Sequence, residues 1–154
     1  MKFGCYILVI ENHMKRIPGY HFDFGWGNGY VLLPHNHPFY NKHYDDIDVN
    51  VHGGLTYSSK FESNNFMRWI ENLKIDGDVT LENFKKFENY WMIGFDTSHA
   101  GDSLDSCPKY YVMNEARNLL DQCLEDKIEG INKYKTIYIR KSKLKKINAI
   151  DKKE

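Results

Sequence analysis

A nearly continuous apolar run ends directly in a polar loop near residue 96, and this run constrains the fold more than any other part of the chain. Residues 91–95, WMIGF, contain no charged side chain. A short run without polar alternation is typical of a strand that is covered on both faces. We therefore expect a buried strand over 91–96 that leads into a functional loop.

The loop after this run carries Asp96, His99 and Asp102 at intervals of three residues. In a helical turn this spacing brings the three side chains near one another. Such a set can bind Zn²⁺, Mn²⁺ or Fe²⁺, act as a base with its orienting group, or hydrogen-bond a sugar or nucleobase. In the structural alternative, the aspartates cap turns and the histidine satisfies a buried carbonyl group.

A second polar cluster follows residues 46–52, in which Ile47, Val49 and Val51 alternate with Asp48, Asn50 and His52. This period of two predicts a strand with one polar face, which carries His52. Gly53 and Gly54 expose backbone N–H groups to a ligand, and Thr56 adds a hydroxyl. The alternative is a strand with one solvated face and a Gly-Gly bulge. The predicted ligand-binding residues are His52, Gly53, Gly54, Thr56, Asp96, His99 and Asp102, all on the same side of the sheet.

The fold class predicted from these patterns is α+β, a single small domain with a mainly antiparallel sheet packed by a C-terminal amphipathic helix. The helix is expected over 110–127, because Val112, Ala116, Leu119 and Cys123 form one apolar stripe. The strands are expected at 3–10, 29–33, 46–57 and 91–96, with a last candidate at 134–139. The domain is expected to span 1–139, followed by a basic tail over 140–154.

Residues 59–89 are predicted to be helical and peripheral, and their aromatic stripe is interpreted as core packing rather than as a cofactor site. The apolar positions Phe61, Phe66, Trp69, Ile70 and Leu73 recur at helical spacing, Asp76 to Asp78 break the run, and a second short helix is expected over 81–89. The glycine run 25–29 is interpreted as a hairpin loop, with a ligand-wrapping loop as the alternative.

Two further histidines lie between prolines, in Pro34-His35-Asn36-His37-Pro38. The prolines hold this piece extended, so His35 and His37 project to the same side and can form a metal-binding pair. The alternative is a stiff surface loop in which both histidines are ordinary polar residues.

The charge balance gives no general attraction to nucleic acid or membrane, because 21 basic and 21 acidic residues cancel. The three scattered cysteines, Cys5, Cys107 and Cys123, indicate reduced thiols in a cytoplasm. The apolar residues 1–10 are too short to span a bilayer and lack a signal-peptide cleavage pattern. We expect no membrane or nucleic-acid partner, and a homo-oligomer stays open.

Two motifs resemble a family of small uncharacterised phage and prophage proteins. They are VHGGLTY at 51–57 and W-x-x-G-F-D-x-x-H-x-G-D at 91–102, and the helix 111–124 follows them. The similarity covers most of 29–124 but not 59–89 or the basic tail. The resemblance implies a phage gene expressed in a bacterial host cytoplasm, and it carries no catalytic assignment.

The first functional hypothesis is a binding protein for a small polar, nucleotide-like ligand. Gly53, Gly54, Thr56, Asp96 and His99 would hydrogen-bond the ligand, and Tyr or Trp rings would stack on it. The phage context suggests that the ligand is a host defence signal that the protein sequesters. No arginine lies near the motifs in sequence, although a phosphate usually recruits one.

The second hypothesis is a metal-dependent hydrolase, so the sequence leaves open whether the protein is an enzyme. The candidate metal ligands are His52, Asp96, His99 and Asp102, with His35 or His37 assisting. A divalent metal is the only cofactor that these residues point to, and no H-x-x-x-H or H-E-x-x-H spacing occurs. A third option is a protein that binds a host protein through its tyrosine-rich surface.

Overall fold

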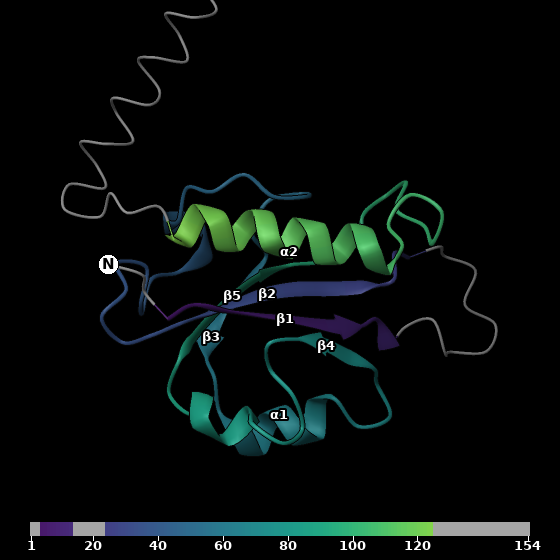
Figure 1. Ribbon diagram of the computed structural model, residues 1–154. Coiled ribbons are helices and arrows are strands. Elements are labelled where there is room, and N and C mark those ends of the chain that lie inside the picture. Colours follow the sequence, from purple (N-terminus) through teal and green to yellow (C-terminus); the bar gives the residue numbers. More distant parts are fainter. Residues whose placement is uncertain (1–3, 14–23, 125–154) are drawn as a thin grey trace, which may run out of the picture. The chain divides into compact units, whose positions relative to one another are not determined.

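The computed structural model describes residues 4–13 and 24–124. Its five strands are β1 Tyr6–Glu11, β2 Gly27–Leu33, β3 Tyr57–Lys60, β4 Ile75–Gly77 and β5 Trp91–Phe95. They form one sheet in the order β3-β5-β2-β1-β4, and every neighbouring pair is antiparallel (Figure 1). The predicted α+β class with an antiparallel sheet is confirmed, and the apolar run at 91–95 is an interior strand of that sheet.

Helix α2, Lys109–Leu124, covers one face of the sheet (Figure 1). Its buried residues are the predicted stripe of Val112, Ala116, Leu119 and Cys123. Gly29 of β2 lets the helix approach closely, because a Cβ there would lie 2.5 Å from the Phe95 ring and 3.3 Å from Ala116. The predicted packing of this helix is confirmed. Its expected continuation to 127, the strand at 134–139 and the basic tail lie outside the described residues.

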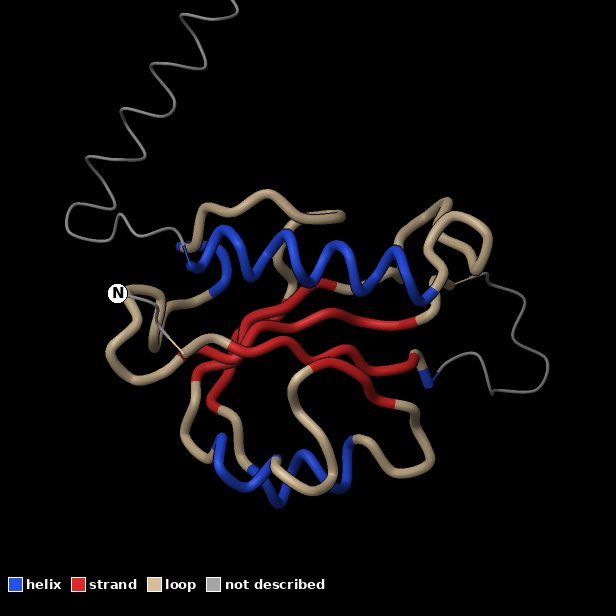
Figure 2. The backbone as a smooth tube through the Cα atoms, viewed as in Figure 1, coloured by secondary structure: helices blue, strands red, loops and turns tan. Residues whose placement is uncertain are grey.

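Residues 61–90, apart from strand β4, cover the opposite face of the sheet with loops and short helical turns (Figure 2). They include α1 Ser63–Trp69 and the 3-10 helix η3 Phe84–Phe87. The core on this face comprises Leu8, Ile10, Tyr30, Leu32, Phe61, Phe66, Ile70, Val79, Phe84, Phe87 and Met92. The interpretation of the aromatic stripe as core packing is therefore confirmed, whereas the predicted peripheral position of the segment is wrong. Spaced aromatic residues also fit a series of short turns that each bury one ring.

Two glycines of the run 25–29 belong to a strand rather than to a hairpin loop. β2 begins at Gly27, which pairs with Glu11 of β1, and Asn28 pairs with Ile10. The hairpin-loop interpretation is therefore wrong for residues 27–29, and only Gly25 and Trp26 lie before the strand. Turn-type residues also occur inside strands where a neighbouring segment comes close.

Residues 46–52 do not form the predicted strand. They follow a 3-10 turn, η2 Tyr44–Asp46, and then run extended beside α2. The backbone N–H of Asn50 donates to Gln122 Oε1 at 2.8 Å, and that of His52 donates to Glu115 Oε2 at 2.9 Å. The alternating pattern does bury Ile47 and Val51. However, the backbone N–H groups of this segment donate to side chains of α2 and not to a neighbouring strand. None of the helices in 4–13 and 24–124 is long and apolar enough to cross a bilayer.

Candidate functional site

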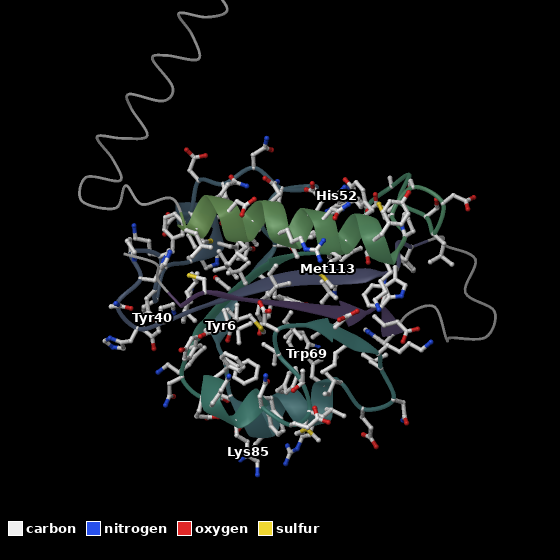
Figure 3. The ribbon with its side chains drawn as sticks, in the orientation of Figure 1. Tyr6, Tyr40, His52, Trp69, Lys85 and Met113 are labelled. Atoms are coloured by element: carbon white, nitrogen blue, oxygen red, sulfur yellow. The ribbon has the colours of Figure 1, made fainter. Side chains whose placement is uncertain are left out.

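Three of the predicted side chains meet in one group, which we call the His–Asp cluster: His52, His99 and Asp102. His52 Nε2 lies 2.9 Å from Asp102 Oδ1 and 3.1 Å from its Oδ2. His99 Nδ1 lies 3.1 Å from the same Oδ2, which also accepts the His99 backbone N–H at 2.9 Å. His52 lies beside α2 (Figure 3), so the cluster joins the loop after β5 to the segment that runs along this helix.

The loop after β5 has a fixed shape because its own polar groups are paired. Ser98 donates its backbone N–H to Asp96 Oδ1 at 3.0 Å, and Asp102 donates its backbone N–H to the His99 carbonyl at 3.0 Å. The buried Thr97 hydroxyl donates to the Gly27 carbonyl at 2.7 Å and ties the loop to β2. The expected helical-turn proximity of His99 and Asp102 therefore arises from a turn that the sheet supports.

Helix α2 holds His52 in position through two side chains one turn apart. The Tyr111 hydroxyl lies 2.9 Å from His52 Nδ1, and Glu115 accepts the His52 backbone N–H. These contacts direct Nε2 toward Asp102. Sequence reasoning missed Tyr111 and Glu115, although their spacing of four residues places both on one face of the predicted helix. Such fixed orientation of a histidine ring is typical of metal sites.

The carboxylate of Asp102 is ionised at neutral pH. Burial raises the pKa of Asp102, whereas hydrogen bonds from the His99 backbone and from the His52 and His99 rings lower it. The lowering is the larger effect, so the pKa lies below its usual value. Its side chain is 8% exposed, whereas that of His99 is 37% exposed. The negative charge is therefore shielded on one side, and solvent or a ligand reaches the cluster from the side of His99.

The donor atoms of the His–Asp cluster lie close enough together to hold one divalent metal ion. One ligand atom from each of the three residues lies within 4.8 Å of the others. Two imidazoles with one carboxylate suit Fe²⁺, Mn²⁺ or Zn²⁺ and leave open coordination positions. Asp96 borders the group, because its Oδ1 lies 3.5 Å from His99 Nε2.

Cys107 adjoins the cluster but does not form a cysteine–histidine nucleophile pair. Its Sγ lies 4.0 Å from His52 Nε2 and 3.7 Å from Asp102 Oδ1. His52 Nε2 already hydrogen-bonds to the Asp102 carboxylate. In addition, burial raises the pKa of the Cys107 thiol. A buried thiol that stays protonated is a poor nucleophile.

The remaining predicted ligand residues differ in their positions. Gly53 has φ +67° and faces the His99 ring, whereas Gly54 has φ +80° and open space around its missing Cβ. Thr56 is exposed, and its backbone N–H donates to the Gly94 carbonyl at 2.9 Å, which extends the pairing of β3 and β5. Gly53 thus shapes the cluster, and Thr56 contributes to the sheet.

Gly53→Ala should disturb the cluster, because a Cβ at this position would lie 2.4 Å from His99 Cε1. The left-handed backbone alone costs about 1–2 kcal/mol for a non-glycine residue, and displacement of His99 adds to that cost. Gly54→Ala is the matched control, since it carries only the backbone cost. Urea denaturation and metal titration of both variants check this, and equal losses of stability and metal affinity would contradict it.

The structure separates His35 and His37, so neither the metal-binding pair nor the surface loop with two ordinary polar histidines describes both residues. His35 is exposed and packs against the Tyr40 ring, with centroids 4.7 Å apart. His37 is buried; its Nδ1 accepts the Phe39 backbone N–H at 3.0 Å, and its Nε2 lies 2.9 Å from the Cys123 carbonyl oxygen. Both ring nitrogens of His37 therefore bind backbone groups, which requires a neutral ring with the proton on Nε2.

Stability should decrease as the pH falls below about 6.5, the ordinary pKa of histidine. Burial lowers the pKa of His37, and the hydrogen bond to Cys123 only partly offsets this. The unfolded chain therefore binds the proton more readily than the folded chain. The neutral ring makes its full contribution to folding stability above about pH 6.5, and this contribution is lost as the pH falls toward the pKa of His37 in the folded protein. Urea midpoints between pH 8 and pH 5 should show a weaker slope in His37→Gln than in His35→Gln; equal slopes would contradict the assignment.

Comparisons with known proteins find no matching family, no matching curated protein and no matching solved structure. The function is therefore argued from the chemistry of the site.

Proposed function

We propose that this protein binds a divalent metal ion through His52, His99 and Asp102 and, with that ion, a small polar ligand of nucleotide-like chemistry. The observation that carries the proposal is the convergence of three metal-ligand side chains within 4.8 Å. His52 and Asp102 are 50 residues apart in sequence, so the convergence results from the fold rather than from local spacing.

The support of the cluster favours binding over a purely structural role. Tyr111 and Glu115 fix His52, and the loop hydrogen bonds fix His99 and Asp102, so the donor atoms are held before any ion arrives. Metal sites are typically built with such supporting contacts. The partial exposure of His99 gives a ligand access to the open coordination positions.

A metal ion would also supply the positive charge that a phosphate group needs. Neither motif carries an arginine, which is the usual partner of phosphate. A divalent ion coordinates phosphate oxygens and replaces that partner. The resemblance to phage proteins extends the proposal to sequestration of a host defence signal in the bacterial cytoplasm.

Metal-dependent hydrolysis at the same site is the second candidate. It is favoured by the open coordination positions that two imidazoles and one carboxylate leave for water and substrate. Asp96 adds a second carboxylate beside His99. The two candidates differ only in whether the bound ligand is converted.

Calorimetric titration of the full chain with Mn²⁺, Zn²⁺ and Mg²⁺ tests the proposal. We expect one equivalent of Mn²⁺ or Zn²⁺ to bind, and Mg²⁺ to bind weakly because it prefers oxygen ligands. His99→Ala should weaken binding by about 100-fold or more. His43→Ala, a change at an exposed histidine outside the cluster, should not. A folded wild-type chain that binds none of these ions would overturn the proposal.

Turnover separates binding from hydrolysis. The Mn²⁺-loaded protein is incubated with nucleoside mono-, di- and triphosphates, and the mixture is analysed by mass spectrometry. The binding function predicts that the nucleotides are recovered intact. A product that requires both the metal and His99 would establish the hydrolase instead.

A further inference from the structure

The thiol of Cys107 lies against two of the three residues of the His–Asp cluster. Its Sγ is 3.7 Å from Asp102 Oδ1 and 4.0 Å from His52 Nε2, and these two atoms are themselves 2.9 Å apart. Cys107 is buried, at 2% exposure. Thiolate, imidazole and carboxylate are the donor groups with which proteins bind zinc. Cys107 is therefore a candidate for a further metal ligand beside His52, His99 and Asp102.

The spacing of these three donor atoms is close to that around one tetrahedral ion. Bonds of about 2.0 Å to nitrogen or oxygen and about 2.3 Å to sulfur place neighbouring donor atoms about 3.3–3.5 Å apart. The separations of 2.9, 3.7 and 4.0 Å depart from those values by about 0.5 Å or less. Small rotations of the Cys107 and His52 side chains would therefore bring sulfur, nitrogen and oxygen to one ion.

The backbone around Cys107 holds the thiol in this place. The Cys107 N–H donates to the Ser103 carbonyl at 2.8 Å, and the Cys107 carbonyl accepts the Trp26 N–H at 2.8 Å. Gly25 leaves the room that this approach needs, since a Cβ on it would lie 2.7 Å from the Cys107 Cβ. Cys107 is thus fixed beside the His–Asp cluster from two sides, by its own loop and by the segment that leads into β2.

We infer that Cys107 is the fourth protein ligand of the metal ion and makes the site selective for Zn²⁺ over Mn²⁺. This inference rests on the proposed function and names the ion. Sulfur is a soft ligand that favours Zn²⁺, whereas Mn²⁺ and Mg²⁺ prefer oxygen ligands. As the bond between sulfur and the ion forms, the bond between sulfur and hydrogen breaks and the proton passes to the solvent.

The surroundings of the sulfur are compatible with this role. The Ser106 hydroxyl donates to Cys107 Sγ at 3.7 Å, so a metal-bound thiolate keeps a hydrogen bond from the protein. Such supporting contacts are typical of metal ligands. Zinc also accepts a fifth donor, and His99 is 37% exposed. A small polar ligand therefore still reaches the ion from the side of His99 when Cys107 is bound.

The absorption spectrum of the full chain loaded with Co²⁺ tests the sulfur ligand without any substitution. Co²⁺ takes the place of Zn²⁺, and a thiolate bound to it gives an intense charge-transfer band in the near ultraviolet. Imidazole and carboxylate ligands alone do not give this band. We expect one equivalent of Co²⁺ to produce the band and one equivalent of Zn²⁺ to remove it. A chain that binds one equivalent of Co²⁺ without the band would overturn the inference.

Cys107→Ser tests which cysteine supplies the sulfur. It should abolish the Co²⁺ band and weaken Zn²⁺ binding by about 100-fold, with a change of less than about threefold for Mn²⁺. Cys5→Ser is the control, because it makes the same change at a partly buried cysteine outside the cluster. Equal Zn²⁺ affinities in the two folded variants would overturn the inference. If Cys107→Ser does not fold, the Co²⁺ spectrum of the unmodified chain decides.

The two levels of the proposal fail in different ways. A chain that binds Zn²⁺ and Mn²⁺ equally well, and shows no Co²⁺ band, keeps the metal site of His52, His99 and Asp102 and refutes only the role of Cys107. A folded chain that binds none of these ions refutes the proposed function and this inference together. Calorimetric titration of the three ions under one set of conditions separates these outcomes.

Discussion

Asp102→Asn should abolish metal binding and lower the free energy of unfolding by about 1–3 kcal/mol. The carboxylate is buried and accepts hydrogen bonds from the backbone and ring of His99 and from the thiol of Cys107, and it lies 2.9 Å from His52 Nε2. An amide is a much poorer metal ligand than a carboxylate, and its NH₂ group would face donors that need an acceptor. Metal titration and urea denaturation measure the two losses separately.

The control for this variant is Asp105→Asn, at an exposed aspartate three residues further along the same loop. This substitution should change neither the free energy of metal binding nor the free energy of unfolding by more than about 0.5 kcal/mol. Because the pKa of Asp102 lies below its usual value, its contribution to stability is present at neutral pH and is lost only as the pH falls below about 4. If Asp102→Asn lost stability but kept its affinity for Mn²⁺, the cluster would be a structural network only.

Phe66→Ala should cost about 3–5 kcal/mol of unfolding free energy. Phe66 is 2% exposed, and its ring centroid lies 5.0 Å from that of Phe61 and 5.5 Å from that of Phe84. Removing the ring would leave a cavity in the core between the sheet and residues 61–90, and rings packed from separate turns cannot easily close over it. Denaturant unfolding at neutral pH gives the value.

The adjacent Met67 provides the comparison, because it is exposed on the same helix. Met67→Ala should change stability by no more than about 0.5 kcal/mol. Similar small losses in both variants would mean that residues 61–90 are peripheral to the sheet, against the packing described above.

The sequence predicted those elements whose hydrophobic pattern has only one structural solution. The apolar run at 91–95 had to be an interior strand, because exposed apolar residues on both faces would be costly. The stripe on α2 likewise fits only a helix that packs along one side, and Val112 and Leu119 are fully buried there. The strand was located from its uninterrupted apolar run, and the helix from the period of its apolar residues.

Other elements were mispredicted because their pattern does not reveal their partner. The alternation at 46–52 indicates an extended chain, but whether a strand or a helix side chain accepts its N–H groups depends on residues about 70 positions away, such as Gln122. In 59–89 the aromatic spacing is compatible with one helix, yet the chain turns repeatedly and places Ile75–Gly77 in the sheet as edge strand β4.

The candidate site was predicted in outline, because two polar clusters each followed an apolar segment. The structure joins His52 to Asp102 and adds supporting residues from α2. The spacing of Tyr111 and Glu115 was visible, but which face of the helix looks toward the loop depends on packing.

The proposed function requires a divalent metal ion to bind between His52, His99 and Asp102. Diffraction from crystals soaked in Mn²⁺, recorded near the manganese absorption edge, tests it most directly. We expect one strong anomalous peak about 2.0–2.3 Å from His52 Nε2, His99 Nδ1 and an Asp102 carboxylate oxygen. A map without a peak at this position, from a crystal soaked well above the measured dissociation constant, would contradict it.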